Sequence, residues 1–201
     1  MIECRDLRYG IVDIDYVSIP PGIIAVTGHN GSGKTTFLHL LAGLLHPEKG
    51  EIRIDEQRPE EVHCGFVSDA PDKNLIFGTV ESELSSPLWF SHKSADLVRE
   101  SVTAIASEIG ISHLLSRNVR KLSGGEKVLV ALATALVSFP ALLILDESDA
   151  YLDEATALRV YSCMRSRSVS YIVYTTHLLD SSLLADMRIC FDQGRIVEVR
   201  L

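Results

Sequence analysis

The stretch "IIAVTGHNGSGKTTFLHLLAGLL", residues 23–45, decides the fold of this chain. Its first residues are apolar and β-branched, which predicts a buried strand, and the apolar residues from Leu38 to Leu45 recur at helical spacing. A glycine-rich loop joins the strand to the helix. The segment therefore predicts a strand, a tight loop and a helix in direct succession.

The loop matches the phosphate-binding P-loop pattern, GxxxxGK followed by Ser or Thr, through Gly28, Gly33, Lys34 and Thr35. Glycines let successive backbone N–H groups turn toward phosphate oxygens, and the following helix directs its positive end at them. We expect Lys34 to reach the terminal phosphates and the Thr35 hydroxyl to bind magnesium. An ordinary glycine turn is the alternative interpretation of the same residues. The residues predicted to hold the nucleotide phosphates are Gly28, His29, Asn30, Gly31, Ser32, Gly33, Lys34, Thr35 and Thr36.

A second strand, in "ALLILDES" at residues 141–148, supplies carboxylates. Its large apolar residues predict a buried strand that delivers Asp146 to the carboxyl end of the sheet, where ligands of open α/β sheets bind. Asp146 is expected to hold magnesium, and Glu147 to polarise a water for attack on the γ-phosphate. Alone, an acidic pair after a strand fits a solvated loop equally well.

The segment "KLSGGEKVLVAL", residues 121–132, places two adjacent glycines where a loop meets an apolar helix. Adjacent glycines cost backbone entropy, which indicates that another group approaches Gly124 and Gly125 closely. The alternative is a plain start of a helix with Ser123 as its N-cap. That alternative leaves the second glycine unexplained.

Taken in order, these motifs resemble the ATP-binding-cassette (ABC) ATPases over nearly the whole chain. Residues 28–36 resemble Walker A, "LSGGE" at 122–126 resembles the family signature, and 141–147 resembles Walker B with its catalytic glutamate. "AYLD", which ends at Asp153, resembles the D-loop, and His177 in "VYTTH" stands where the family has its switch histidine. Tyr9 stands where the family has an aromatic residue that stacks on adenine, although a strand core residue is an equal alternative.

The resemblance implies an α/β P-loop NTPase with a mostly parallel core sheet, N-terminal antiparallel strands and an inserted helical subdomain. It implies ATP and Mg²⁺ as cofactors. It also implies a head-to-tail dimer, either homodimer or heterodimer, in which Ser123, Gly124 and Gly125 of one subunit close over the ATP on the P-loop of the other. We expect one ABC domain over residues 1–201, with a catalytic core at 1–79 and 138–201 and a helical signature subdomain at 80–137.

The overall composition fits this interpretation, because 201 residues that are 46% hydrophobic suffice for one domain with a substantial core. A formal net charge of −8 argues against a nucleic-acid partner, which would favour a basic chain. The start "MIECRDLRYG" reads as a strand and not as a signal peptide. Pro140 divides the long apolar run at 128–145 into a buried helix and a buried strand, so we expect no membrane span.

The cysteines predict neither a disulfide framework nor a metal site, because they are far apart and form no CxxC pair. We expect buried free thiols. The four residues are Cys4, Cys64, Cys163 and Cys190.

The segment "APDKNLIFGTVESELSSPL", residues 70–88, is similar to the ATPases of energy-coupling-factor importers. In it, Thr79 is expected to cap a helix whose first turn carries Glu81 and Glu83. The resemblance implies a motor subunit that lies on the cytoplasmic face of the membrane and drives transmembrane partners. The alternatives are an exporter subunit, a soluble ABC ATPase and a non-hydrolysing nucleotide-binding regulator. The short spacing from signature to Walker B excludes the chromosome-maintenance branch. Because "QGRIVEVRL" predicts a turn and a strand, we expect no extra regulatory domain in this chain.

One position departs from the family pattern. In "GFVSDAPDKN" the glutamine that binds magnesium and couples to the partners falls on Asp69, or else on Ser68, and neither is an amide. If Asp69 faces the site, it joins Asp146 and Glu147 in a carboxylate cluster whose repulsion bound magnesium relieves. The alternative is that Asp69 begins a solvated turn.

Overall fold

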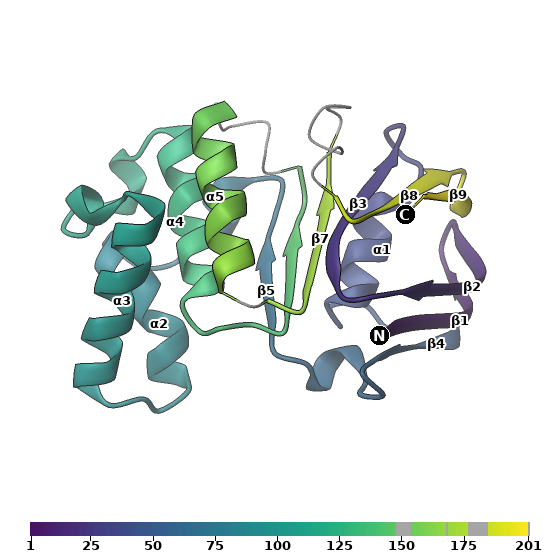
Figure 1. Ribbon diagram of the computed structural model, residues 1–201, viewed down its shortest axis with the longest axis horizontal. Coiled ribbons are helices and arrows are strands. Elements are labelled where there is room, and N and C mark those ends of the chain that lie inside the picture. Colours follow the sequence, from purple (N-terminus) through teal and green to yellow (C-terminus); the bar gives the residue numbers. More distant parts are fainter. Residues whose placement is uncertain (148–153, 168, 177–184, 201) are drawn as a thin grey trace. The chain divides into compact units, whose positions relative to one another are not determined.

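The protein is described here by a computed structural model (Figure 1), which places residues 1–147, 154–167, 169–176 and 185–200. The chain forms two compact units. The first unit comprises Met1–Phe66, Ala141–Glu147 and Ser170–Leu201, and the second comprises Val67–Pro140 and Ser148–Val169. The second unit is therefore larger than the helical segment expected at 80–137, because it also includes residues 67–79, 138–140 and 148–169.

A six-stranded sheet forms the centre of the first unit, in the order β5-β6-β7-β3-β8-β9. Its strands are β3 (Gly22–Gly28), β5 (Cys64–Val67), β6 (Leu142–Leu145), β7 (Tyr171–Thr175), β8 (Met187–Asp192) and β9 (Arg195–Arg200). Strand β3 pairs in parallel with β7 and β8, β6 pairs in parallel with β7, and β9 runs antiparallel to β8. The prediction of a mostly parallel core sheet is confirmed, and the carboxyl ends of β3, β6 and β7 meet at one edge.

Helix α1 (Lys34–Leu41) follows β3 and packs against β3 and β7. It buries Phe37, Leu38, Leu40 and Leu41, which join the apolar residues of β3 in one core. This burial removes the apolar side of the helix from water and fixes its start at the end of β3. The strand, loop and helix predicted from residues 23–45 are confirmed, except that the helix ends at Leu41 and does not reach Leu45.

The first unit also contains a three-stranded antiparallel sheet of order β2-β1-β4. Its strands are β1 (Ile2–Tyr9), β2 (Val12–Ile19) and β4 (Lys49–Ile54), and the short 3₁₀ helix η1 (Pro59–Glu61) follows. One face carries buried residues such as Ile2, Cys4 and Leu7, which belong to the same core as α1. The predicted N-terminal antiparallel strands are confirmed.

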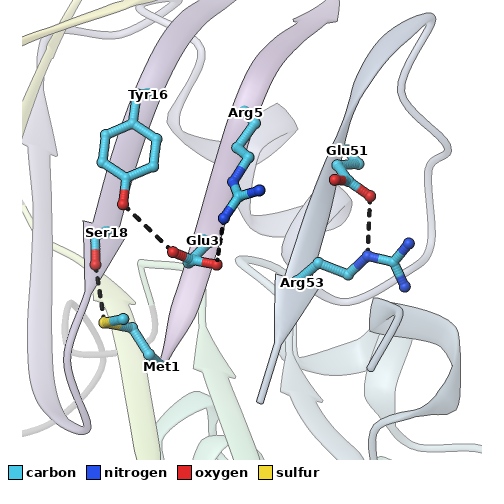
Figure 2. Close-up of polar contacts among 7 residues, drawn as sticks. All are labelled: Met1, Glu3, Arg5, Tyr16, Ser18, Glu51 and Arg53. Atoms are coloured by element: carbon cyan, nitrogen blue, oxygen red, sulfur yellow. Dashed lines mark hydrogen bonds and ion pairs between the residues drawn. The ribbon is translucent and has the colours of Figure 1, made fainter. Parts of the chain in front are cut away.

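The opposite face of this sheet carries polar pairs (Figure 2). Glu3 accepts hydrogen bonds from Arg5 at 3.1 Å and from the Tyr16 hydroxyl at 3.4 Å, so it joins neighbouring strands. On β4, Arg53 donates to Glu51 at 2.9 Å. Exposed pairs of this kind contribute little to stability.

The second unit is mostly helical. Its elements are the 3₁₀ helix η2 (Pro71–Asn74), α2 (Val80–Phe90), α3 (Ala95–Ile109), η3 (Ser112–Leu114), η4 (Val119–Lys121), α4 (Gly124–Leu136) and α5 (Glu154–Ser166). Thr79 is the N-cap of α2 as predicted, and its hydroxyl accepts from the Ser82 N–H. Helix α4 and strand β6 confirm the division of residues 128–145 at Pro140.

An ion pair fastens the chain after α5 to helix α3 within the second unit. The Arg167 guanidinium donates to both carboxylate oxygens of Glu108, at 2.8 and 3.0 Å. It also lies 4.8 Å from the centroid of the Phe139 ring. Because this ion pair is bidentate and the Arg167 side chain is buried, the pair is stronger than an ordinary surface ion pair.

All four cysteines are free, as predicted, and two of them are buried and two half-buried. Burial raises the pKa of the Cys4 and Cys64 thiols to about 12, so both stay protonated at neutral pH. In the part of the chain that the structure describes, no helix is both long and apolar enough to span a membrane.

Candidate functional site

The P-loop lies at the carboxyl end of β3 and opens directly into α1. Gly28 has φ +141°, and a Cβ there would lie 2.3 Å from the Phe191 carbonyl oxygen, so only glycine fits. Gly33 is the N-cap of α1 with φ +106° and provides no side-chain cap. The first N–H groups of α1 are therefore left for an anionic ligand, together with the positive end of the helix.

Lys34 folds back into the loop. Its side chain is buried, with 4% of the residue exposed, and Nζ donates to the carbonyl oxygens of Gly28 at 2.9 Å and His29 at 3.1 Å. The hydroxyl of Ser32 is also buried, and it has no hydrogen-bond partner among the described residues. An ammonium, free N–H groups and an unpartnered hydroxyl together fit a phosphate chain.

A cavity of about 470 Å³ adjoins the loop, which is a size typical of small-molecule sites. Its lining consists of Tyr9, Gly10, Ile11, Asn30, Gly31, Gly33, Lys34, Thr35, Thr36 and Glu147. Tyr9 ends β1, is half-buried and packs against the core while it also lines the cavity, and its stacking on adenine stays a prediction. The cavity thus brings an aromatic ring, the P-loop cation and a carboxylate together within the first unit.

The two predicted carboxylates follow β6 and are joined through a residue that sequence reasoning missed. Asp146 is 2% exposed, and its Oδ1 accepts a hydrogen bond from the Thr175 hydroxyl at 2.6 Å. The same hydroxyl accepts the backbone N–H of Glu147 at 2.8 Å. In the parallel pairing of β6 with β7, Leu145 lies opposite Tyr174, which brings Asp146 and Thr175 together at the next position.

The contacts that the turn between β8 and β9 makes with the P-loop were also missed. Asp192 lies 2.9 Å from His29 Nε2, and the Gly194 N–H donates to the Ser32 carbonyl at 2.9 Å. The Gly194 carbonyl accepts the Asp13 N–H at 2.9 Å. One turn therefore connects the P-loop to β2, which continues the hairpin that carries Tyr9.

The signature residues lie in the second unit, at the start of α4. Ser123 is the N-cap and forms a capping box with Glu126, in which each side chain accepts the other residue's backbone N–H. Neither Gly124 nor Gly125 has a positive φ, so the backbone conformation alone does not require glycine. Ser123 and Gly124 are exposed, and this end of the helix is accessible.

Asp69 belongs to the second unit as well. Its carboxylate lies 3.7 Å from the Lys73 ammonium, and 58% of its side chain is exposed. The hydroxyl of Ser68 is used within the loop, where it donates to the Ala70 carbonyl at 3.0 Å and also contacts Asn74. The metal-binding role of Asp69 stays a prediction. Two further predicted residues, Asp153 and His177, lie outside the described residues.

Comparison with known proteins agrees with this geometry. A family model described as "ABC transporter" matches residues 16–150. The molybdenum import ATP-binding protein ModC of Brucella melitensis is 37% identical over 191 residues, which cover 87% of this chain and 52% of that protein. The energy-coupling factor transporter ATP-binding protein EcfA1 of Listeria monocytogenes is 32% identical over 199 residues, which cover 94% of this chain and 71% of that protein. This chain thus spans about half the length of ModC.

Two solved structures show the same fold. The cbiO1 protein from Clostridium perfringens, part of the ABC transporter complex cbiONQ, superposes with a TM-score of 0.88 at 26% identity, covering 98% of this chain and 87% of that one. The dimeric ATP-binding cassette MJ0796, bound to ADP and Pi, superposes with a TM-score of 0.89 at 20% identity, covering all of this chain and 98% of that one.

Proposed function

The chain belongs to the ATP-binding family of ABC transporter proteins, and we propose that it is the ATP-hydrolysing motor subunit of a membrane importer of the energy-coupling-factor type. The observation that carries the proposal is the cavity that Tyr9, the P-loop and Glu147 line together. The adenine ring, the phosphates and the attacking water of ATP hydrolysis need an aromatic ring, a P-loop and a carboxylate, respectively, within one pocket. The name of ModC, a molybdenum import protein, favours import over export, and the name of EcfA1 favours the energy-coupling-factor type.

The positions of these side chains support the following roles in hydrolysis. Lys34 and the first N–H groups of α1 hold the β- and γ-phosphates, and Tyr9 stacks on the adenine. Thr35 and Asp146 would hold Mg²⁺, which neutralises charge on the phosphate oxygens when it is bound. Glu147 accepts the proton of the water whose oxygen attacks the γ-phosphorus, and the bond to the ADP oxygen breaks.

Two residues outside the described part complete this proposal. His177 would contact the γ-phosphate as the switch histidine, and Asp153 would contribute the D-loop. Both assignments rest on the sequence resemblance.

A second subunit would complete the site, head to tail. The start of α4 supports this proposal, because Ser123 and Gly124 are exposed at the positive end of a 13-residue helix. The two glycines leave room for a partner's γ-phosphate, and a side chain at Gly124 would occupy that room.

Membrane-spanning subunits are the further partners that we propose, with the chain held on the cytoplasmic face of the membrane. An apolar patch on the second unit supports this. Ile76 is 83% exposed and Phe90 is 75% exposed. The ring centroid of Phe77 lies 6.5 Å from that of Phe90 and 6.3 Å from that of Trp89. Large apolar residues gathered in this way mark interaction sites.

The test of the hydrolytic role is Glu147→Gln. The change removes the base but keeps the shape of the side chain and the Lys34 contacts, so we expect the hydrolysis rate to fall at least about 100-fold while ATP binding survives. Gel filtration with ATP should show a longer-lived dimer. The matched control is Glu100→Gln on the exposed side of α3, which should behave as the unmodified chain. A Glu147→Gln protein that hydrolyses ATP normally and stays monomeric would contradict the proposal.

A further inference from the structure

The hydroxyl of Thr175 contacts both carboxylate residues of the candidate site. It donates to Asp146 Oδ1 at 2.6 Å and accepts the Glu147 N–H at 2.8 Å. We propose that Thr175 is a positioning residue for hydrolysis, which holds the metal-binding and water-activating carboxylates in register. This inference rests on the proposed function.

The direction of both hydrogen bonds is fixed by chemistry. A backbone N–H only donates, so the hydroxyl must accept from Glu147 and use its single proton on Asp146. Thr175 is 1% exposed and Asp146 is 2% exposed, so water does not replace either bond. One buried hydroxyl therefore joins the end of β7 to the residues that follow β6. A methyl group in its place would remove both hydrogen bonds, one of them to a buried carboxylate.

The backbone of Glu147 makes this contact important. Glu147 has φ +49°, a left-handed conformation that costs a residue with a side chain of order 1 kcal/mol. A hydrogen bond to its own N–H stabilises the peptide group at this unusual turn. Glu147 also lines the cavity together with Lys34, so the position of its backbone sets the position of its carboxylate. Loss of the Thr175 hydroxyl should thus let the Glu147 backbone relax and move its carboxylate away from the attacking water.

The consequence is specific to the chemical step. The phosphate contacts come from Lys34 and the start of α1, which do not contact Thr175 in any of the described hydrogen bonds. A hydroxyl that only stabilised the fold would change the melting temperature and leave kcat intact. A positioning role instead predicts a fall in kcat with nucleotide affinity retained, because displacement of a catalytic group by about 1 Å costs on the order of 100-fold in rate.

The first experiment compares Thr175→Val with Thr134→Val in the full chain. Valine keeps the shape of threonine and removes the hydroxyl. Thr134 is the matched control, because its hydroxyl oxygen is buried and has no hydrogen-bond partner among the described residues. We expect Thr175→Val to lower kcat by about 10- to 100-fold, with the Kd for ATP, measured without magnesium, changed less than about 3-fold. Thr134→Val should keep both values.

The second comparison sets Thr175→Ser against Thr175→Ala, whose side chains differ by one oxygen atom. Both are small enough for the site, so they test the proposal even if the Thr175→Val protein does not fold. Serine should restore kcat to within about 3-fold of the unmodified chain, and alanine should not. Equal kcat values for the serine and alanine proteins would overturn the proposal, as would a Thr175→Val protein with unchanged kcat. Glu147→Gln is measured in parallel: if it hydrolyses ATP as fast as the unmodified chain, the proposed function itself fails, whereas an inactive Glu147→Gln beside a fully active Thr175→Val protein refutes only the role of Thr175.

Discussion

Replacing Gly194 with alanine tests how much the close packing of the turn between β8 and β9 contributes to stability and to the shape of the nucleotide cavity. Gly194 has φ +82°, and a Cβ at this position would lie 1.7 Å from the Ile11 carbonyl oxygen and 2.5 Å from the carbonyl carbon. Its N–H and carbonyl join Ser32 of the P-loop to Asp13 of β2. The added methyl group therefore meets rigid backbone and pushes the hairpin of the cavity away from the P-loop.

The cost can be worked from two contributions. A positive φ costs an alanine about 1 kcal/mol relative to glycine. A backbone clash that forces neighbouring segments to shift adds about 1–3 kcal/mol, as overpacking does elsewhere. We thus expect Gly194→Ala to lower the free energy of unfolding by about 2–4 kcal/mol. The affinity for ATP should fall as well, because Ile11 lines the cavity beside Gly10.

Urea unfolding followed by circular dichroism measures the loss, with Gly10→Ala as the matched control. Gly10 also has a positive φ, +53°, but a Cβ there would meet nothing within 4 Å. The control should therefore lose only the conformational part, about 1 kcal/mol. The difference of about 2 kcal/mol corresponds to roughly 1 M in the urea midpoint at a typical slope of about 2 kcal/mol per M. If Gly194→Ala cost no more than Gly10→Ala, the close packing of this turn on Ile11 would be refuted.

Three further predictions follow from other parts of the chain. Asp69→Ala should raise the magnesium concentration for half-maximal hydrolysis and lower the maximal rate, and Asp69→Gln should restore part of the rate; a magnesium titration with unaltered rate and midpoint would support the solvated-turn alternative. The hydrogen bonds from Arg167 hold the pKa of Glu108 below its ordinary 4.5, so the pair stabilises the fold above that pH and is lost as the pH falls through the lower folded pKa; Glu108→Gln should flatten the acid side of the stability curve, and an unchanged curve from urea unfolding at several pH values would contradict this. A Gly124→Asp protein mixed with a Lys34→Ala protein should regain ATPase activity, because one composite site then carries neither change, and inactivity of verified heterodimers would count against the head-to-tail dimer.

Local patterns were enough to predict the P-loop and the strand before Asp146, because in both the chemistry and the conformation depend on neighbours in the sequence. Gly28 and Gly33 are required by their own φ angles, and the apolar run before Asp146 needs burial whatever the topology. Helix α4 is a similar case, since Ser123 and Glu126 form its cap within one turn. These features were visible without knowledge of any long-range contact.

The contacts of Gly194 could not be predicted in the same way. In the sequence, "DQGR" at 192–195 indicates a turn before a strand, and the structure confirms that turn. The reason that no side chain fits at Gly194 lies in Ile11, more than 180 positions earlier in the chain. Only the placement of β8 and β9 beside the P-loop reveals that the glycine serves the cavity as well as the turn.

Thr175 was missed for a different reason, which concerns residue type. Threonine is common in strands, so "VYTTH" draws attention to His177 and gives no sign that one hydroxyl has a partner. Lys34, Asp146 and Glu147 are recognisable because phosphate, metal and water chemistry each demand one kind of side chain. A positioning residue has to satisfy geometry alone, and serine would provide the same donor and acceptor. Once β6 is known to pair in parallel with β7, the register places Thr175 beside Asp146. The sequence of either strand alone does not indicate that this hydroxyl contacts the carboxylate.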